Sequence, residues 1–152
     1  MFKKIIATIA AFCLVQCSNI TVNAAENTMK QVQPSSSIYS VGNINGCSVS
    51  LSSSGGSLYL SGFTYCNGQM KKVGITDIKV YRSSNNSEWS YYSSADDLIN
   101  ENSSRYDESN VNIGTIVKGY YYRITCNHYA KETGLFGKSE SISNTSNSVY
   151  VP

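Results

Sequence analysis

The sequence predicts an all-β protein: an antiparallel sandwich of about seven strands that follows a signal peptide. Three observations support this fold class. Apolar and polar residues alternate in short segments, which is the period of a strand with one buried face. Turn-forming residues such as the Ser-Ser-Gly-Gly of residues 53–56 separate those segments. No segment beyond the N-terminal apolar run keeps a helical period, so helices are not expected to contribute to the core.

The N-terminus has the three parts of a signal peptide. Lys3 and Lys4 precede an apolar run at residues 5–15, and residues 22–24 (Val-Asn-Ala) offer a small-residue cleavage site. The run is far shorter than the roughly 20 apolar residues that a spanning helix needs. We therefore expect residues 1–24 to be a cleaved signal peptide and the chain to be secreted.

A second processing route remains open at Cys17. The Leu-Val-Gln-Cys of residues 14–17 resembles a bacterial lipobox, which would place a lipid on Cys17 and tether the protein. Gln16 stands where that motif has a small residue, so simple secretion is the leading expectation.

The mature chain is predicted to have two parts. Residues 25–45 show no strong hydrophobic period and are predicted to be a linker or N-terminal arm, and residues 46–152 form the predicted domain.

Charge and composition exclude several classes of protein. The chain has 12 basic and 10 acidic residues, and two of the basic ones are in the leader, so the mature protein is close to neutral. A neutral chain has no electrostatic basis for binding nucleic acid or an anionic membrane by charge alone. The remaining length suits one domain, and 12 tyrosines add apolar area for a core. No later segment could span a membrane, and we expect a monomer.

Seven short segments have strand character, with polar turns between them. Polar residues after Asn67 predict a loop, residues 94–105 predict another that includes at most one helical turn, and residues 133–137 a third. This spacing is typical of immunoglobulin or fibronectin type III sandwiches, with a small barrel as the alternative. The predicted strands lie within residues 47–51, 58–66, 78–80, 89–91, 111–113, 120–129 and 149–151.

The strongest strand resembles strand F of fibronectin type III domains. Residues 116–124 read Ile-Val-Lys-Gly-Tyr-Tyr-Tyr-Arg-Ile, where an apolar residue and a glycine precede a corner tyrosine. The resemblance implies that the hydroxyl of Tyr120 or Tyr122 bonds back to the chain. Either choice places Tyr120, Tyr122, Ile124 and Cys126 inward. Trp89 departs from the pattern, because such domains keep their core tryptophan in an earlier strand.

The mature chain also resembles a group of small uncharacterised secreted proteins of Gram-positive bacteria. The shared features are the signal peptide, the Gly-Gly hairpin, the segment at residues 82–89, and a Gly-Tyr-Tyr-Tyr-Arg strand that ends near residues 128–131. The resemblance implies the sandwich fold and carries no known activity, so it assigns no functional residue.

The cysteines predict one disulfide. Cys13 and Cys17 leave with the leader, and Cys47, Cys66 and Cys126 remain in an oxidising compartment, all with inward parity. A Cys66–Cys126 bridge between sheets, as in immunoglobulin domains, is the leading expectation, and a Cys47–Cys66 bridge within a hairpin is the alternative. The third thiol is expected to be a small buried apolar group.

No residue pattern indicates catalysis, a metal or a cofactor. His128 is the only histidine, and no Gly-x-Ser-x-Gly is present to supply a nucleophile. The cysteines lack the close spacing of metal ligands. We therefore expect no catalytic residues, no bound metal and no cofactor.

Outward-facing tyrosines are the candidate binding residues. Strand parity places Tyr81, Tyr92, Tyr121 and Tyr129 on the surface, where tyrosine supplies contact area at low entropic cost. The leading interpretation is a secreted module that binds an extracellular protein. A carbohydrate-binding module is the alternative. For the tyrosines themselves, the competing interpretation is that they merely suit a sheet surface. A linear row of aromatic residues would favour sugars, and a broad mixed patch would favour protein.

Overall fold

The computed structural model describes residues 42–152, and the predicted signal peptide, Cys17 and nearly all of the predicted linker lie outside them. The described chain is all-β, as the sequence predicts. None of these residues forms a helix, so this part of the chain holds no helical segment able to cross a bilayer. The strands are β1 (Ile44–Ser54), β2 (Ser57–Ser83), β3 (Ser90–Ala95), β4 (Leu98–Thr115), β5 (Tyr120–Lys131), β6 (Ser139–Thr145) and β7 (Val149–Val151).

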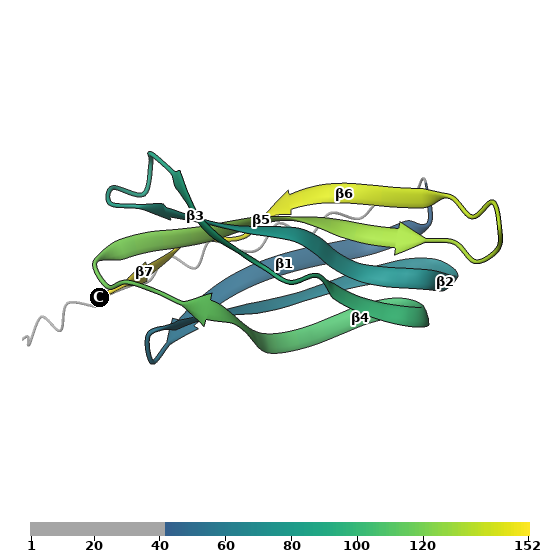
Figure 1. Ribbon diagram of the computed structural model, residues 1–152, viewed down its shortest axis with the longest axis horizontal. Helices are drawn as coiled ribbons and strands as arrows, with labels where there is room; N and C mark the ends of the chain where they lie inside the picture. The colour runs from purple at the N-terminus through teal and green to yellow at the C-terminus, as the bar shows by residue number, and fades with distance from the viewer. Residues whose placement is uncertain (1–41) are drawn as a thin grey trace, which may run out of the picture. The chain divides into compact units, whose positions relative to one another are not determined.

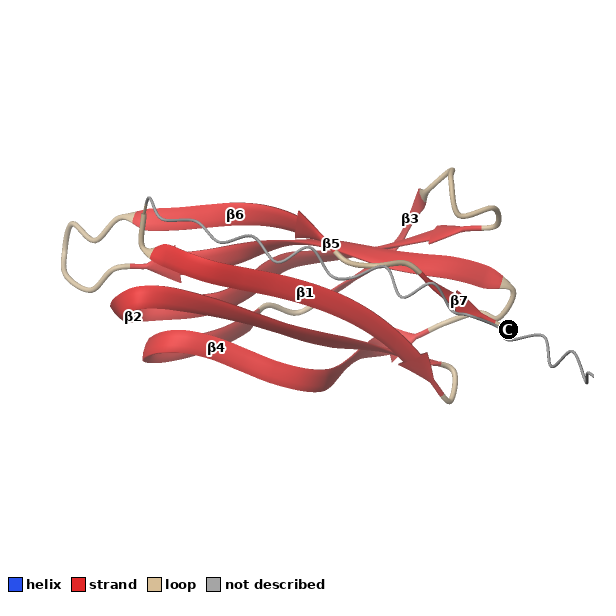
Figure 2. Ribbon diagram, turned by 180° about the vertical axis from the view of Figure 1, so that it is seen from behind, coloured by secondary structure: helices blue, strands red, loops and turns tan. Residues whose placement is uncertain are grey.

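All seven strands belong to one curled antiparallel sheet built around β2 (Figures 1 and 2). The first half of β2, residues 57–66, pairs with β1 on one side and β4 on the other. Its second half, residues 72–83, pairs with β5 on one side and with the start of β4 and β3 on the other. Both β6 and β7 pair with β5. Strand β2 thus pairs directly with four of the other six strands.

A bend in β2 allows this arrangement. Residues 66–69 of β2 face only Ser104 of β4, because Tyr65 pairs with Arg105 and Met70 pairs with Ser103. Such an excess of residues on one strand bends it sharply. The bend is bonded to both neighbours: the Asn67 amide donates to the Asn43 carbonyl at 2.9 Å, and the side chain of Gln69 donates to the Asn102 carbonyl at 2.9 Å. The loop predicted to begin at Asn67 is therefore wrong; these polar residues continue the strand.

Two other elements differ from the sequence prediction. Residues 98–105, predicted as loop or helical turn, are the first part of β4, and residues 139–145, which were not predicted as a strand, form β6. Both strands pair mainly on one side, β4 with β2 and β6 with β5. An edge strand with exposed faces tolerates polar residues, so hydrophobic alternation does not reveal it.

The core lies inside the curl, and alternation of buried and outward residues is clearest in β5. In β5 every second residue is buried, which confirms the predicted parity of that strand. The facing positions come from the two halves of β2 and from β1. The largest fully buried side chains are Tyr106, Tyr122, Ile44, Leu58, Leu60, Ile75, Ile78, Ile124, His128, Val49, Val73 and Val80.

Tyr122, rather than Tyr120, is the corner tyrosine. Its ring is fully buried, and its hydroxyl donates to the Val117 carbonyl at 2.8 Å and accepts from the Val117 amide at 3.1 Å. One side chain therefore satisfies both backbone groups of a residue in the turn before β5. This contact fixes the path from β4 into β5.

Replacing Tyr122 by phenylalanine tests the corner. The variant keeps the ring but leaves both Val117 groups without their partner, so we expect the free energy of unfolding to fall by about 2 kcal/mol. Urea denaturation followed by tryptophan fluorescence measures this. Tyr121→Phe is the matched control, because that hydroxyl points outward, and it should change stability by less than about 0.5 kcal/mol. Equal losses in the two variants would contradict the role of the corner.

Candidate binding surface

Aromatic side chains from four strands meet on the outer face of the sheet, at the end that carries β3 and β7. We call the surface formed by Trp89, Tyr81, Tyr91, Arg123, Tyr121 and Tyr150 the aromatic face. Strand pairing brings these residues together: Tyr81 of β2 lies between Tyr91 of β3 and Arg123 of β5, and Tyr121 of β5 lies opposite Tyr150 of β7. Neighbouring residues on each strand point into the core, which turns these side chains outward.

The rings contact one another at steep angles. Tyr81 and Tyr91 meet edge to face, with centroids 6.2 Å apart and planes at 82°, and Tyr121 and Tyr150 are tilted by 47° at 4.9 Å. Tyr91 and Tyr150 are 58% and 51% exposed. The result is a mixed, uneven patch rather than a flat row of coplanar rings.

Arg123 lies in the middle of this face, and its guanidinium has neither a hydrogen bond at Nε nor an ion pair among the described residues. Its guanidinium carbon is 4.2 Å from the centre of the Trp89 ring, which is cation–π stacking geometry. Its Nε atom is buried and has no hydrogen-bond partner in the part of the chain that the structure describes. No acidic side chain among residues 42–152 forms an ion pair with it. A guanidinium held by stacking alone can still bind a carboxylate or carbonyl group.

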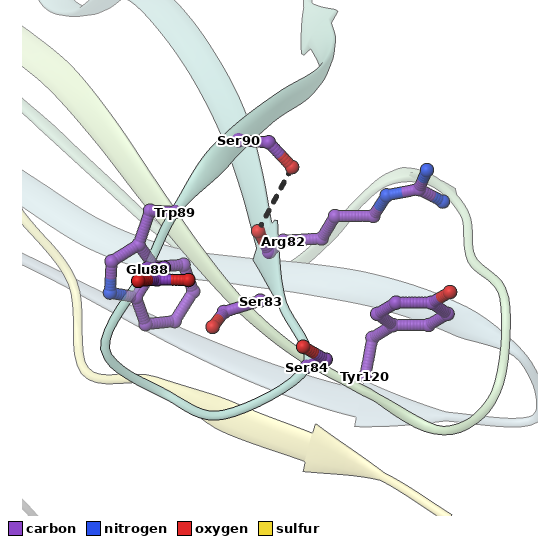
Figure 3. A pocket seen from close by; sticks show the side chains of 7 residues that line it. All are labelled: Arg82, Ser83, Ser84, Glu88, Trp89, Ser90 and Tyr120. Atoms are coloured by element: carbon purple, nitrogen blue, oxygen red, sulfur yellow. Dashed lines mark hydrogen bonds between the residues drawn. The ribbon is translucent and has the colours of Figure 1, made fainter.

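An open hollow of about 320 Å³ adjoins the aromatic face (Figure 3). Trp89 and Glu88 lie on one side of it and Tyr120 on the other, and three serines lie between. The loop that carries Glu88 is shaped by Asn85, whose side-chain oxygen accepts from the backbone amides of Ser87 and Glu88 at 3.0 and 2.9 Å. The hollow is therefore preformed and large enough for one protruding side chain.

Two of the four tyrosines predicted for binding lie on the aromatic face, and two do not. Tyr81 and Tyr121 point outward as expected. Tyr92 packs against the core, with its ring 5.5 Å from that of Tyr122, because a bulge in the β2–β3 pairing skips it and turns Tyr91 outward instead. Tyr129 faces outward at the far end of β5, where its hydroxyl lies 3.4 Å from that of Ser139.

Trp89, Tyr91, Arg123 and Tyr150 complete the face but were not among the predicted binding residues. Alternation already places Arg123 and Tyr150 outward, because their neighbours Ile124 and Val151 are buried. Alternation shows that a side chain points outward, but it does not show which other side chains lie near it. Which outward residues become neighbours depends on the order of strands in the sheet, and β7 reaches β5 only after the chain has passed through β6.

His128 is fully buried in the core, away from the aromatic face. Thr64 donates its hydroxyl hydrogen to the Gly74 carbonyl at 2.9 Å, so the Nδ1 atom of His128, 2.8 Å from that hydroxyl oxygen, must be the donor in their contact. The Nε2 atom is then an acceptor, and it has no partner within residues 42–152. Burial lowers the pKa of His128 to about 4, so the ring is neutral at physiological pH.

The three cysteines of the described chain are buried free thiols, and neither predicted bridge is present. Cys47 lies opposite Thr64, not Cys66, so these two thiols are only diagonal neighbours. Thr64 contacts His128, and the first half of β2 runs in the same direction as β5 (Figure 1). Cys66 follows Thr64 whereas Cys126 precedes His128, which displaces the two thiols by roughly 13 Å along the strands. That exceeds the reach of a disulfide.

The described residues define an all-β protein with an exposed aromatic face. Comparisons with protein-family models, with curated proteins and with solved structures found no match for this chain. Fold class and surface chemistry are therefore the grounds for a functional proposal.

Buried His128 predicts a loss of stability in acid. The unfolded chain takes up a proton near pH 6.5, whereas burial lowers the pKa of His128 in the folded protein to about 4. The unfolded state therefore binds more protons between these values, so the free energy of unfolding should fall by about 3 kcal/mol as the pH drops through this window. Urea denaturation at a series of pH values measures the loss.

His128→Gln is the control, because glutamine keeps a donor for Thr64 but does not titrate. Hydrogen bonds from Asn43 and from the Lys138 amide also lower the pKa of Glu132, which adds acid sensitivity to both proteins. The difference between the two profiles thus isolates the histidine. Parallel profiles from pH 7 to pH 4 would contradict the prediction.

The thiols should resist alkylation in the folded protein. Burial raises the pKa of Cys66 to about 11; burial, with a smaller contribution from Cys47, raises the pKa of Cys126 to about 12. Little reactive thiolate is then present at neutral pH. Iodoacetamide followed by peptide mapping should label Cys47, Cys66 and Cys126 only after denaturation. Two cysteines that stay unlabelled in denaturant until a reductant is added would show a disulfide instead.

Proposed function

We propose that this protein is exported and that its β domain is a non-enzymatic module that binds an extracellular protein through the aromatic face. The leader at residues 1–24 supports export, and release into the medium is favoured over a lipid tether at Cys17 because Gln16 departs from the lipobox. The resemblance to small secreted proteins of Gram-positive bacteria supports the same location.

The composition of the aromatic face carries this proposal. Tyrosine, tryptophan and arginine are the residues that most often dominate the energy of protein interfaces. Here Trp89, Arg123 and two exposed tyrosines, Tyr91 and Tyr150, lie on one surface built on paired strands. Because the strands are rigid, little conformational entropy is lost on binding. The unpaired guanidinium of Arg123 is suited to a carboxylate or a backbone carbonyl of the partner.

Ring geometry favours a protein over a carbohydrate. A sugar chain needs aromatic rings presented flat along its length, whereas Tyr81 and Tyr91 stand at 82° to each other. One face of Trp89 is covered by Arg123. The adjoining hollow beside Glu88 and Tyr120 suits a single protruding side chain. These features are typical of an irregular protein surface rather than of a sugar-stacking row.

An immunoglobulin or fibronectin type III-like sandwich is the fold that we propose for this module. The pairing of β1, the first half of β2 and the end of β4 supports one layer, and that of β3, the second half of β2, β5, β6 and β7 supports the other. The corner hydrogen bonds of Tyr122 are a further feature of such sandwiches. Trp89 is a departure, because it lies on the surface against Arg123.

Capture of a partner with paired variants tests the proposal. The mature protein is immobilised and exposed to extracellular and envelope proteins of its host, in parallel with a Tyr91→Ser/Tyr150→Ser variant. Each serine removes an exposed ring without disturbing the core, so folding should be preserved. We expect a partner retained by the natural protein, with an affinity at least about tenfold weaker for the double variant in calorimetry of the purified pair.

Tyr59→Ser provides the matched control, because Tyr59 also faces outward but lies in the first half of β2, away from the aromatic face. It should bind as the natural protein does. Equal affinity of all three proteins would refute the assignment of the surface. Binding on a glycan array that the double variant loses would instead establish the carbohydrate-binding alternative.

A further inference from the structure

The loop between β5 and β6, residues 132–138, exposes two large apolar side chains side by side in the sequence. Leu135 is 92% exposed and Phe136 is 91% exposed. Single exposed apolar residues are common on protein surfaces, but an adjacent pair that is almost wholly in water is unfavourable and calls for an explanation. This pair, which we call the apolar tip, is separate from the aromatic face.

The loop is held in shape by bonds across its base. The Glu132 amide donates to the Lys138 carbonyl at 2.9 Å, and the Lys138 amide donates to the Glu132 carboxylate at 3.0 Å. A side chain on Gly137 would collide with the Glu132 carbonyl, so only glycine allows this closure. The apolar tip is thus presented outward by a closed turn rather than left on a loose loop.

The apolar tip projects from the end of the domain. Figures 1 and 2 both show the β5–β6 loop extending beyond the bends of β2 and β4 at this end. The described chain also begins here, because the Asn43 side chain donates to the Glu132 carboxylate at 2.9 Å. The aromatic face lies toward the opposite end, with β3 and β7.

Four lysines lie at the end of the domain that carries the apolar tip. Lys131 and Lys138 flank the loop, Lys72 lies opposite Lys131 across the β2–β5 pairing, and Lys71 is its exposed neighbour. Three carboxylates share this end: Glu101 lies 3.6 Å from Lys72, Glu132 bonds to Asn43 and Lys138, and Glu140 accepts from the Asn43 amide at 2.6 Å. These carboxylates keep their negative charge, so the lysines exceed them by one charge. An apolar centre with ammonium groups beside it suits the phosphate headgroups of a bilayer.

We propose that the apolar tip inserts into the interfacial region of an anionic lipid bilayer and docks the domain there. Leu135 and Phe136 enter the acyl boundary while the lysines contact headgroup phosphates. A convex pair of side chains needs no shaped pocket in a bilayer, which favours lipid over a protein partner. The described chain begins at this same end, where Asn43 contacts Glu132. Docking there leaves the aromatic face directed away from the membrane.

Vesicle sedimentation tests this docking. The mature protein is mixed with vesicles of phosphatidylcholine containing 30 mol% phosphatidylglycerol, beside a Leu135→Ser/Phe136→Ser variant. Burying two such side chains is worth a few kcal/mol at most, so binding should be weak and reversible. We expect the variant to partition at least about tenfold less. The natural protein should also bind phosphatidylcholine alone less well, because the lysine contribution is lost.

Two controls keep the result interpretable. Val117→Ser removes another exposed apolar side chain, 50% exposed and remote from the apolar tip, and should not change partitioning. A Trp89→Phe/Phe136→Trp protein places the only tryptophan at the tip, where its emission should shift to the blue and be quenched by brominated lipid. Circular dichroism establishes that each variant is folded.

Absence of binding to either vesicle, or equal partitioning of the natural protein and the tip variant, would overturn the proposal. If the tip variant instead loses a protein partner while no protein binds vesicles, the apolar tip is a protein contact and the lipid assignment is wrong. Neither result bears on the aromatic face, whose variants leave Leu135 and Phe136 intact.

Discussion

The architecture depends on one constraint: β2 must remain a continuous strand of 27 residues while it bends to serve both halves of the curled sheet. It pairs with β1, β3, β4 and β5. Two glycines make the close approach of its neighbours possible. Gly62 leaves the space that the Ile75 side chain fills, so the two halves of β2 pack on each other, and Gly74 admits the backbone of Leu98 where a Cβ would collide. A side chain at Gly62 would force the halves apart, and one at Gly74 would displace β4 from β2.

The same bend in β2 places the aromatic face and the apolar tip at opposite ends of the domain. Because β2 reverses its course, the β2–β3 loop lies at one end of the domain and the β5–β6 loop at the other (Figure 1). The aromatic face is built on the pairing of Tyr81, Arg123 and Tyr121 near the first end, and Leu135 and Phe136 project from the second. Neither surface contains the buried His128. A domain docked by its apolar tip would present its aromatic face outward, so the two proposals are compatible but independent.

How far the sequence predicts the structure differs between elements. Strand β5 is predicted over residues 120–129 and extends only to Lys131, because its inward face touches the core and every second residue from Tyr122 on is buried. Strand β6 and the first part of β4 escape prediction, because backbone pairing at an edge holds these polar residues without a regular apolar face. The predicted outward direction of Tyr92 is wrong because one bulge reverses it, and a bulge arises between two strands rather than within one sequence. The predicted Cys66–Cys126 bridge is absent for a related reason. Alternation predicts that both side chains point into the core, but the distance between them depends on how their strands are aligned.

The sequence by itself determines the all-β class and the inward set of β5, and it limits the corner tyrosine to Tyr120 or Tyr122, since these depend on local alternation and on one turn. It also contains the candidate export signal. Only the tertiary structure decides that residues 66–69 continue a strand and that Tyr91 and Tyr150, rather than Tyr92 and Tyr129, join Tyr81 and Tyr121. The physical reason is that a surface is made of side chains from strands far apart in the chain. Their adjacency is set by hydrogen-bonded register, which no single strand encodes.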